Sequence, residues 1–167
     1  MRILMMLLLV TEVAFGQQVC RTEAEIPSTT PDARYLIDTN NGTVVDLDTE
    51  LMWARCPLGK SGTNCEIGSD TFYDLADSKS VTANSTLSGY INWRLPNIKE
   101  LNDLVENRCF NPAVNLNAFP NVYQEGDSAA SIFWSSTIEN KLRFQSGETV
   151  ILNSLNSYQV RMVRDMY

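Results

Sequence analysis

The sequence predicts an α+β domain of short antiparallel strands, two helices and long ordered loops, held by two disulfides. Three observations support this prediction. Apolar residues occur in short runs bounded by turn-forming residues, which is typical of short strands. Helical spacing of apolar residues is clear after Pro96 and weaker after Ser69. Four cysteines follow an apolar leader, and an even count in an exported chain indicates disulfides.

Residues 1–16 are predicted to be a secretory signal peptide. Arg2 precedes an apolar run over residues 3–10, and Ala14-Phe15-Gly16 supplies a small-x-small cleavage pattern. The run is too short to span a bilayer, so we expect no membrane span after cleavage. The alternative is an uncleaved N-terminal anchor. The chain is therefore expected to be exported, to the periplasm, the cell surface or the medium.

The remaining residues have the size of one domain, which we divide into an extended lead-in (17–34) and a single folded domain (35–167). The formal net charge is −7, with a pI near 4.5. An acidic surface repels phosphate backbones, so nucleic acid is not expected as a partner. The charge also argues against anionic polysaccharides, unless the basic residues gather on one face.

The four cysteines allow three pairings. Cys56 and Cys65 bracket a loop rich in turn-forming residues, so we pair them with each other. Cys20 is then left with Cys109, a bond that ties the lead-in to the far end of the second helix. A four-thiolate zinc site is the alternative, but such sites usually contain two close Cys-x₂₋₄-Cys pairs, and the sequence contains none.

A three-strand antiparallel meander is predicted at the start of the domain. Its strands are expected over residues 35–37, 43–47 and 51–55. Asn41-Gly42 suits the positive φ of the first hairpin turn. Oxygen-bearing side chains cluster here, and calcium binding is an alternative to a simple turn-forming role. The cluster comprises Asp38, Asn40, Asp46, Asp48 and Glu50.

A first, shorter helix is expected to follow Ser69-Asp70. Thr71 and Asp74 have the spacing of a capping box, and Phe72, Leu75 and Ala76 would then face the core. Residues 79–88 are polar and are expected to form a loop.

A strand end, a corner and a helix start are predicted within residues 89–101. Tyr90, Ile91 and Trp93 favour extended structure, and Pro96 keeps Leu95 extended. Asn97 stands where an N-cap should, with Glu100 three residues later to complete a capping box. The apolar face of this helix is formed by Ile98, Leu101, Leu104 and Val105.

The C-terminal third is predicted to be mainly strands. After an irregular connection (111–121), strands are expected at 132–138 and 158–164. Between them, a hairpin should join 141–145 to 149–152 through Ser146-Gly147-Glu148.

The strands at 43–47 and 51–55, the pair Cys56 and Cys65, the corner at 93–96 and then Cys109 follow one another in a characteristic order. This order resembles the bacterial family of domains typified by the C-terminal domain of the Legionella collagen-like adhesin. The corner at 93–96 is also similar to that of formylglycine-generating-type domains, so the resemblance implies a C-type-lectin-like fold. It marks as a structural motif Trp53, Trp93, Arg94, Leu95, Pro96, Glu100, Trp134, Arg161 and Arg164. The adhesin that typifies the family binds sulfated glycosaminoglycans through positive charge, whereas this chain is acidic. The resemblance thus implies adhesion, whereas the acidic charge of this chain argues against a sulfated ligand.

Catalysis is not expected. The sequence contains no histidine, which excludes Ser-His triads and histidine metal ligands. Disulfide-bonded cysteines supply neither a thiolate nucleophile nor the thiol pair of a cysteine-dependent oxidase. No motif selects a pair of carboxylates among the 20 acidic residues.

Several side chains have both a ligand-binding and a structural interpretation, and we favour the structural one. Tryptophans in core-like strands are usually core residues rather than platforms for sugars. Arginines usually pair with acidic neighbours and pack their stems, rather than bind anions. Ser135-Ser136-Thr137 is interpreted as a locally bonded strand segment. The residues concerned are Trp53, Trp93, Trp134, Arg94, Arg161 and Arg164.

The sequence therefore predicts an exported, non-catalytic binding module with no cofactor. It would recognise a glycan or a cell-surface protein through loops on a rigid frame. The loops expected to bind are 60–68, 79–88 and 121–130. The alternative is a structural subunit of a pilus or other cell-surface assembly, with no small ligand.

Overall fold

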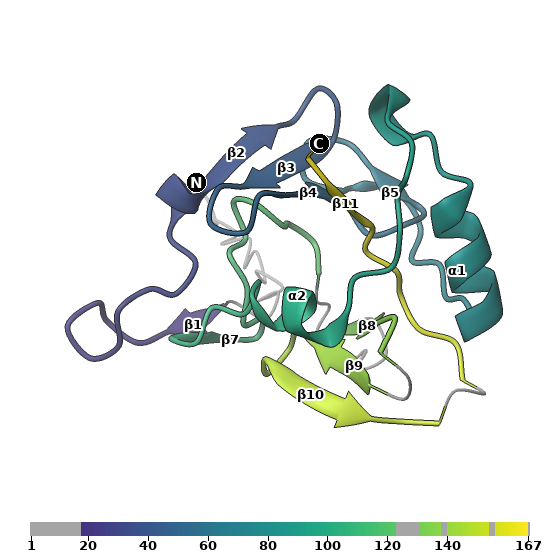
Figure 1. The fold of residues 1–167 in the computed structure, drawn as a ribbon. Helices are drawn as coiled ribbons and strands as arrows, with labels where there is room; N and C mark the ends of the chain where they lie inside the picture. Colours follow the sequence, from purple (N-terminus) through teal and green to yellow (C-terminus); the bar gives the residue numbers. More distant parts are fainter. Residues whose placement is uncertain (1–17, 123–130, 138–139, 154–155, 167) are drawn as a thin grey trace, which may run out of the picture.

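The computed structural model describes residues 18–122, 131–137, 140–153 and 156–166 (Figure 1). The predicted signal peptide and most of the predicted loop 121–130 lie outside the described residues. In chain order the elements are β1 (Val19–Cys20), η1 (Asp32–Arg34), β2 (Tyr35–Asp38), β3 (Thr43–Asp46), β4 (Leu51–Ala54), β5 (Lys60–Ser61), β6 (Ile67–Gly68), α1 (Leu75–Ala83), η2 (Leu87–Gly89), α2 (Ile98–Asn102), β7 (Cys109–Phe110), β8 (Ile132–Trp134), β9 (Asn140–Arg143), β10 (Glu148–Ile151) and β11 (Val163–Asp165). The fold is thus mixed, mostly strands with two α-helices among the described residues.

The predicted meander is confirmed as β2, β3 and β4, and the C-terminal strand β11 completes this sheet in the order β11-β4-β3-β2. Its first turn forms because the Asp38 carboxylate accepts hydrogen bonds from the backbone N–H groups of Asn40 and Asn41, at 3.1 and 3.0 Å. Gly42 takes a φ of 67°, as expected for the last residue of this turn.

A second sheet has the order β10-β9-β8, and its hairpin β9–β10 confirms the predicted one. The predicted strands 132–138 and 158–164 are longer than the strands observed. Residues 158–162 pass from the second sheet to the first, so this segment makes only isolated bridges before β11, such as Phe133 with Gln159. In Figure 1, α2 lies between the two sheets and α1 flanks them.

The first helix begins later than predicted. Tyr73 forms a bridge with Tyr158 and is therefore held extended, so the cap is Asp74, whose side chain accepts from Asp77 N–H at 2.8 Å. The helix α1 then extends into the predicted loop 79–88. Phe72 is exposed rather than buried, as is Ala76, while Leu75 is only half-buried.

The buried face of α1 is instead formed by two hydroxyl residues, Ser78 and Thr82. Their side chains donate to carbonyls of the preceding turn, Ser78 to Leu75 at 2.8 Å and Thr82 to Ser78 at 2.9 Å. This local bonding satisfies the hydroxyls and lets a polar face pack against the body.

The predicted capping box of α2 is confirmed. The Asn97 side chain accepts from the N–H groups of Lys99 and Glu100, and Glu100 accepts from the Asn97 N–H at 2.7 Å. The helix is short, so Leu104 and Val105 follow it in a turn, although both are buried. Residues before the corner form no strand: Ile91 is 64% exposed, and only Arg94 bridges to Val163.

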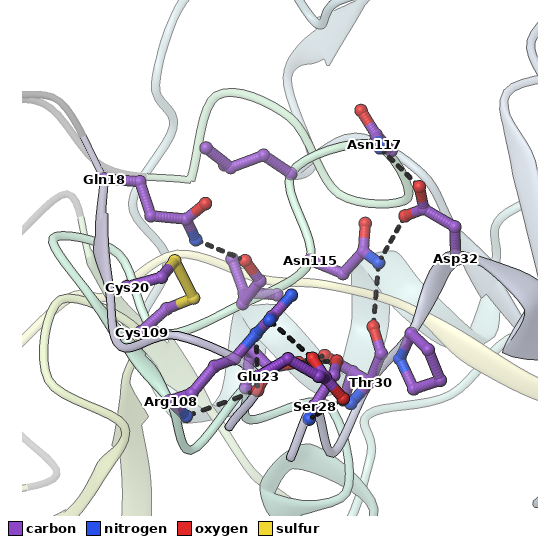
Figure 2. A pocket seen from close by; sticks show the side chains of 14 residues that line it. Gln18, Cys20, Glu23, Ser28, Thr30, Asp32, Arg108, Cys109, Asn115 and Asn117 are labelled. Atoms are coloured by element: carbon purple, nitrogen blue, oxygen red, sulfur yellow. Dashed lines mark hydrogen bonds and ion pairs between the residues drawn. A yellow bond between two sulfur atoms is a disulfide. The ribbon is translucent and has the colours of Figure 1, made fainter. Parts of the chain in front are cut away.

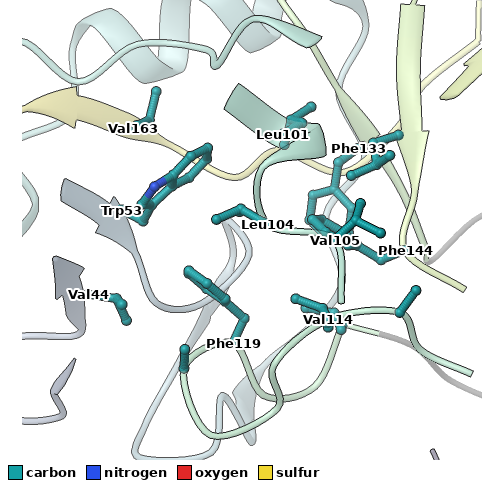
Figure 3. Packing of buried hydrophobic residues seen from close by; sticks show 14 of the residues in the cluster. Val44, Trp53, Leu101, Leu104, Val105, Val114, Phe119, Phe133, Phe144 and Val163 are labelled. Carbon is teal, nitrogen blue, oxygen red and sulfur yellow. The ribbon is translucent and has the colours of Figure 1, made fainter. Parts of the chain in front are cut away.

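Two apolar clusters pack on opposite faces of the four-stranded sheet. Strand alternation places Val44, Trp53 and Val163 in the first cluster, where α2 and Phe119 meet them (Figure 3). The second cluster contains the other two tryptophans with Met52, Ala54, Leu95 and Met162. Each tryptophan is 1% exposed, so all three are core residues.

Both predicted disulfides are present, Cys20–Cys109 and Cys56–Cys65. The lead-in is predicted to be extended and held by Cys20, and its strand β1 pairs with β7 directly beside the first disulfide. The bond fixes Cys20 opposite Cys109, which brings the two short backbone segments into register.

Candidate functional site

Three cavities in the described part of the structure are candidate sites. The first, the N-terminal seam, is a cavity of about 350 Å³ between the lead-in (18–32) and residues 106–117 (Figure 2). At its base lies Glu106, which is 3% exposed. Its carboxylate accepts from Ser28 Oγ at 2.5 Å and from both the N–H and the Oγ1 of Thr30 at 3.0 Å. The backbone N–H groups of Thr29 and Arg108 also donate to it, each at 3.2 Å.

These hydrogen bonds keep Glu106 ionised. Burial alone would raise the pKa of Glu106, but the donors from Ser28, Thr30, Thr29 and Arg108 outweigh burial and lower the pKa to about 2. The carboxylate therefore works as a clamp that holds the lead-in on the body of the domain.

The remaining polar groups of the seam also bond to one another. Asp32 accepts from the side-chain amides of Asn115 and Asn117, both at 2.8 Å. Arg108 forms an ion pair with Glu23 at 2.6 Å. Figure 2 shows these contacts crossing the cavity. Because most of its donors and acceptors already bond to one another, the seam is built for stability rather than for a ligand.

The second cavity, of about 440 Å³, lies between α1 and the corner that contains Trp93. Four of the predicted motif residues meet here in a structural role, namely Trp93, Arg94, Leu95 and Glu100. Arg94 binds both Glu100 oxygens at 2.9 Å and Asp165 at 3.0 Å, and hydrogen bonding to Glu100 raises the pKa of Arg94. The Trp93 indole donates to the Leu87 carbonyl at 3.2 Å. The corner is therefore held in place by its own hydrogen bonds and ion pairs.

The prediction that arginines pair with acidic neighbours holds for Arg94 but is wrong for Arg161. Arg161 is completely buried, donates to the carbonyls of Ala54 and Arg55, and lies 4.9 Å from the centre of the Phe119 ring. Burial, and then the charge of Arg55, lower the pKa of Arg161 to about 9. Aromatic faces and backbone carbonyls can accept a guanidinium without a carboxylate, and sequence spacing does not reveal them.

Arg164 likewise has no ion pair among the described residues. Its guanidinium lies 4.7 Å from the centre of the Tyr90 ring and contacts the Met52 sulfur at 3.9 Å. Within the predicted hydroxyl segment, Ser135 is bonded locally as expected, because its Oγ donates to the Asn140 carbonyl at 2.7 Å. Thr137 Oγ1 instead accepts from the distant Ile98 N–H at 3.1 Å.

The third cavity, which we term the hairpin groove, has a volume of about 410 Å³. It lies between the β2–β3 turn, the loop closed by Cys56–Cys65 and η2. Its floor is apolar and is formed by Ala54, Leu58, Leu87 and Met162. Its rim is polar and neutral and includes Thr39, Asn40, Ser61 and Thr63.

The rim of the hairpin groove is held by a rigid frame. Besides the disulfide, Lys60 Nζ pairs with Asp70 at 2.7 Å, and Arg55 donates to the Thr63 carbonyl. Strands β5 and β6 approach so closely that a Cβ at Gly68 would lie 2.2 Å from the Gly59 carbonyl oxygen, so glycine is required there. Across the groove, Ser88 Oγ donates to the Asn41 carbonyl and ties η2 to the turn.

The rim differs from the seam in one respect that matters for binding. Within the part of the chain that the structure describes, the side chains of Thr39, Asn40, Ser61 and Thr63 make no hydrogen bond. They are therefore free to bond a ligand without breaking a contact of the fold. A rigid groove with free polar groups over an apolar floor has the character of a small-ligand site.

The predicted binding loops contribute unequally to this groove. Loop 60–68 supplies part of its rim, and of segment 79–88 Leu87 lines the floor. Sequence reasoning missed the turn residues Thr39 and Asn40 as part of a binding rim. The sequence signal that could have revealed them is that this turn carries more amide and hydroxyl side chains than are needed to form the turn.

The acidic cluster does not converge on a cation. Asp46 is fully buried and pairs with Arg34 at 2.5 Å, and Asp48 lies 3.5 Å from the same guanidinium. Asp38 bonds its own turn. Among the described residues, no group of three or more acidic, cysteine or histidine side chains is arranged to hold a metal.

The fold defines a small two-disulfide α+β domain, in which the hairpin groove combines an apolar floor with free polar side chains. The chain belongs to the Lcl C-terminal domain family, whose sequence profile matches residues 42–164. No curated protein and no solved structure matches the chain. The family is associated with adhesins, and together with the two disulfides this suggests an extracellular location. No helix in the described ranges is long and apolar enough to cross a membrane.

Proposed function

We propose that the chain is an exported, non-catalytic adhesion domain that binds a glycan in the hairpin groove. The observation that carries the proposal is the set of free amide and hydroxyl side chains, among them Asn40 and Thr63, above an apolar floor. Hydroxyl-rich ligands need such donors and acceptors, and a rigid frame limits the entropy lost on binding. Family membership supports the adhesive role, and the proposed fold is C-type-lectin-like.

The non-catalytic part of the proposal rests on the state of the acidic groups. Glu106 and Asp46 are buried and committed to hydrogen bonds or ion pairs that hold them ionised. A general acid needs a raised pKa at a site that a substrate can reach. Burial raises the pKa of Asp103, but this residue lines none of the three cavities. The whole chain also contains no histidine.

A glycan array of the oxidised mature protein tests the proposal. The double variant Asn40→Ala/Thr63→Ala should weaken binding to neutral glycans about tenfold or more, because each side chain contributes a hydrogen bond to the ligand. Both residues are exposed, so folding should not change. The matched control is Asn107→Ala/Ser157→Ala, which changes exposed residues outside the groove. An array without binding, or equal binding by both double variants, would contradict the proposal and favour a protein partner.

We further propose that binding needs no calcium, because the acidic side chains of the turn region are engaged by Arg34 and by their own turns. Chelation with EDTA should leave both array binding and the unfolding midpoint unchanged. A loss of binding that added calcium restores would show that the acidic cluster holds an ion.

The second candidate function, a structural subunit of a surface assembly, is favoured by exposed apolar residues on edge strands. Leu36 on β2 is 58% exposed and Ile151 on β10 is 75% exposed, and edge strands can pair with other chains. Light scattering distinguishes this function: concentration-dependent assembly that Leu36→Lys abolishes would favour it over a monomeric glycan-binding domain.

A further inference from the structure

The charge of the hairpin groove selects for a neutral ligand. Among the described residues that line it, Lys60 is the one ionisable residue, and its ammonium group is already paired with Asp70 at 2.7 Å. The Lys60 side chain is 5% exposed, so it cannot easily turn towards a ligand. A charged group placed in the groove would lose water without gaining a counter-ion, which is unfavourable. A sulfated or phosphorylated ligand therefore does not fit.

The floor of the groove adds a second requirement. Ala54 and Met162 are joined by a backbone hydrogen bond of 2.9 Å, and Leu58 and Leu87 complete an apolar surface of aliphatic and thioether groups. No aromatic ring lines the groove within the described residues, so a sugar ring has no face on which to stack. The floor instead fits a small aliphatic group, and a bare hydroxyl pressed against it would lose its hydrogen bonds to water.

We infer that the ligand is a neutral saccharide carrying an N-acetyl group. The acetamido methyl packs on the floor against Leu58 and Leu87, and the acetamido N–H and C=O bond to rim side chains such as Asn40 and Thr63. This inference rests on the proposed function, since it names the glycan class for the same groove. It accounts for a groove that combines neutral polar groups with an aliphatic floor.

The test compares three monosaccharide probes by NMR titration of the oxidised mature protein. N-acetylglucosamine should bind about tenfold more tightly than glucose, because an apolar group of this size in an apolar pocket changes affinity by roughly that factor. Glucosamine, whose amine is charged at pH 7, should bind no better than glucose. Equal affinity of the three sugars would overturn the inference.

A floor variant separates the inference from the function itself. Leu87→Asn should reduce the preference for N-acetylglucosamine to less than threefold, whereas the control Leu47→Asn, at an exposed site outside the groove, should keep it. A preference that survives Leu87→Asn would show that the methyl group lies elsewhere. If Leu87→Asn fails to fold, the titration of the wild-type protein with the three monosaccharides still tests the inference. Neutral glycan binding on the array without an N-acetyl preference would leave the proposed function standing and remove the inference, whereas an array without binding removes both.

Discussion

Removal of the Cys20–Cys109 disulfide, by changing both cysteines to alanine, should lower the free energy of unfolding by about 4.6 kcal/mol. The bond joins residues 89 positions apart, and the entropy that a cross-link removes from the unfolded chain grows with loop length. The short Cys56–Cys65 loop, with a separation of 9, should contribute only about 2.7 kcal/mol. Guanidinium unfolding of the two double-alanine variants measures both values.

The comparison of the two variants is the informative control, because each removes one disulfide and adds the same side chains. The variant without Cys20–Cys109 should also free the start of the lead-in, since β1 contains only two residues and the Glu106 clamp begins at Ser28. Limited proteolysis should then cleave before Ser28 in that variant alone. An equal or larger loss of stability in the Cys56/Cys65 variant would contradict the chain-entropy argument.

Glu106→Ala is expected to destabilise the domain by about 3–5 kcal/mol, the range for removing one partner from a buried charged network. The change leaves the hydroxyl groups of Ser28 and Thr30, and the N–H group of Thr30, without their acceptor. Glu106→Gln should cost less, about 2–3 kcal/mol, since it keeps the volume but loses the charge. The control Glu148→Ala, at a 64% exposed side chain, should change stability by less than about 0.5 kcal/mol.

Glu106 should also make the free energy of unfolding depend on pH. The pKa of Glu106 is about 2 in the folded protein against an ordinary value of 4.5, so its contribution is present above about pH 5 and is lost as the pH falls towards 2. The difference is about 3 kcal/mol. Denaturant unfolding between pH 6 and pH 2 should thus show the gap between wild type and Glu106→Gln closing at low pH. A gap that is independent of pH would show that the clamp is not ionic.

Local signals predicted much of the fold. The capping box at Asn97 and Glu100 and the Asn41-Gly42 turn each form within a few residues, so their sequence signature is sufficient. The start of α1 was missed because Tyr73 is held extended by Tyr158, a contact between residues distant in the sequence. The sequence predicts Thr71 and Asp74 as the two members of one capping box, but because Tyr73 is extended the cap is Asp74 itself.

The candidate site was less predictable than the fold. The hairpin groove combines a turn near Asn40, the disulfide loop near Thr63 and a floor residue, Leu87, from η2. No one of these segments indicates a cavity on its own. The partners of Arg161 were hidden for the same reason, because they are carbonyl groups and ring faces brought together only by folding.

The central claim, that the hairpin groove is the binding site, is tested most directly by mapping backbone amide chemical shifts. The oxidised, isotope-labelled protein would be titrated with the neutral saccharide that binds best on the array. We predict that the largest shifts fall on Asn40, Gly42, Ser61 and Thr63. Shifts that instead cluster along the N-terminal seam, around Thr30 and Arg108, would contradict the assignment and place the ligand in the cavity interpreted here as structural.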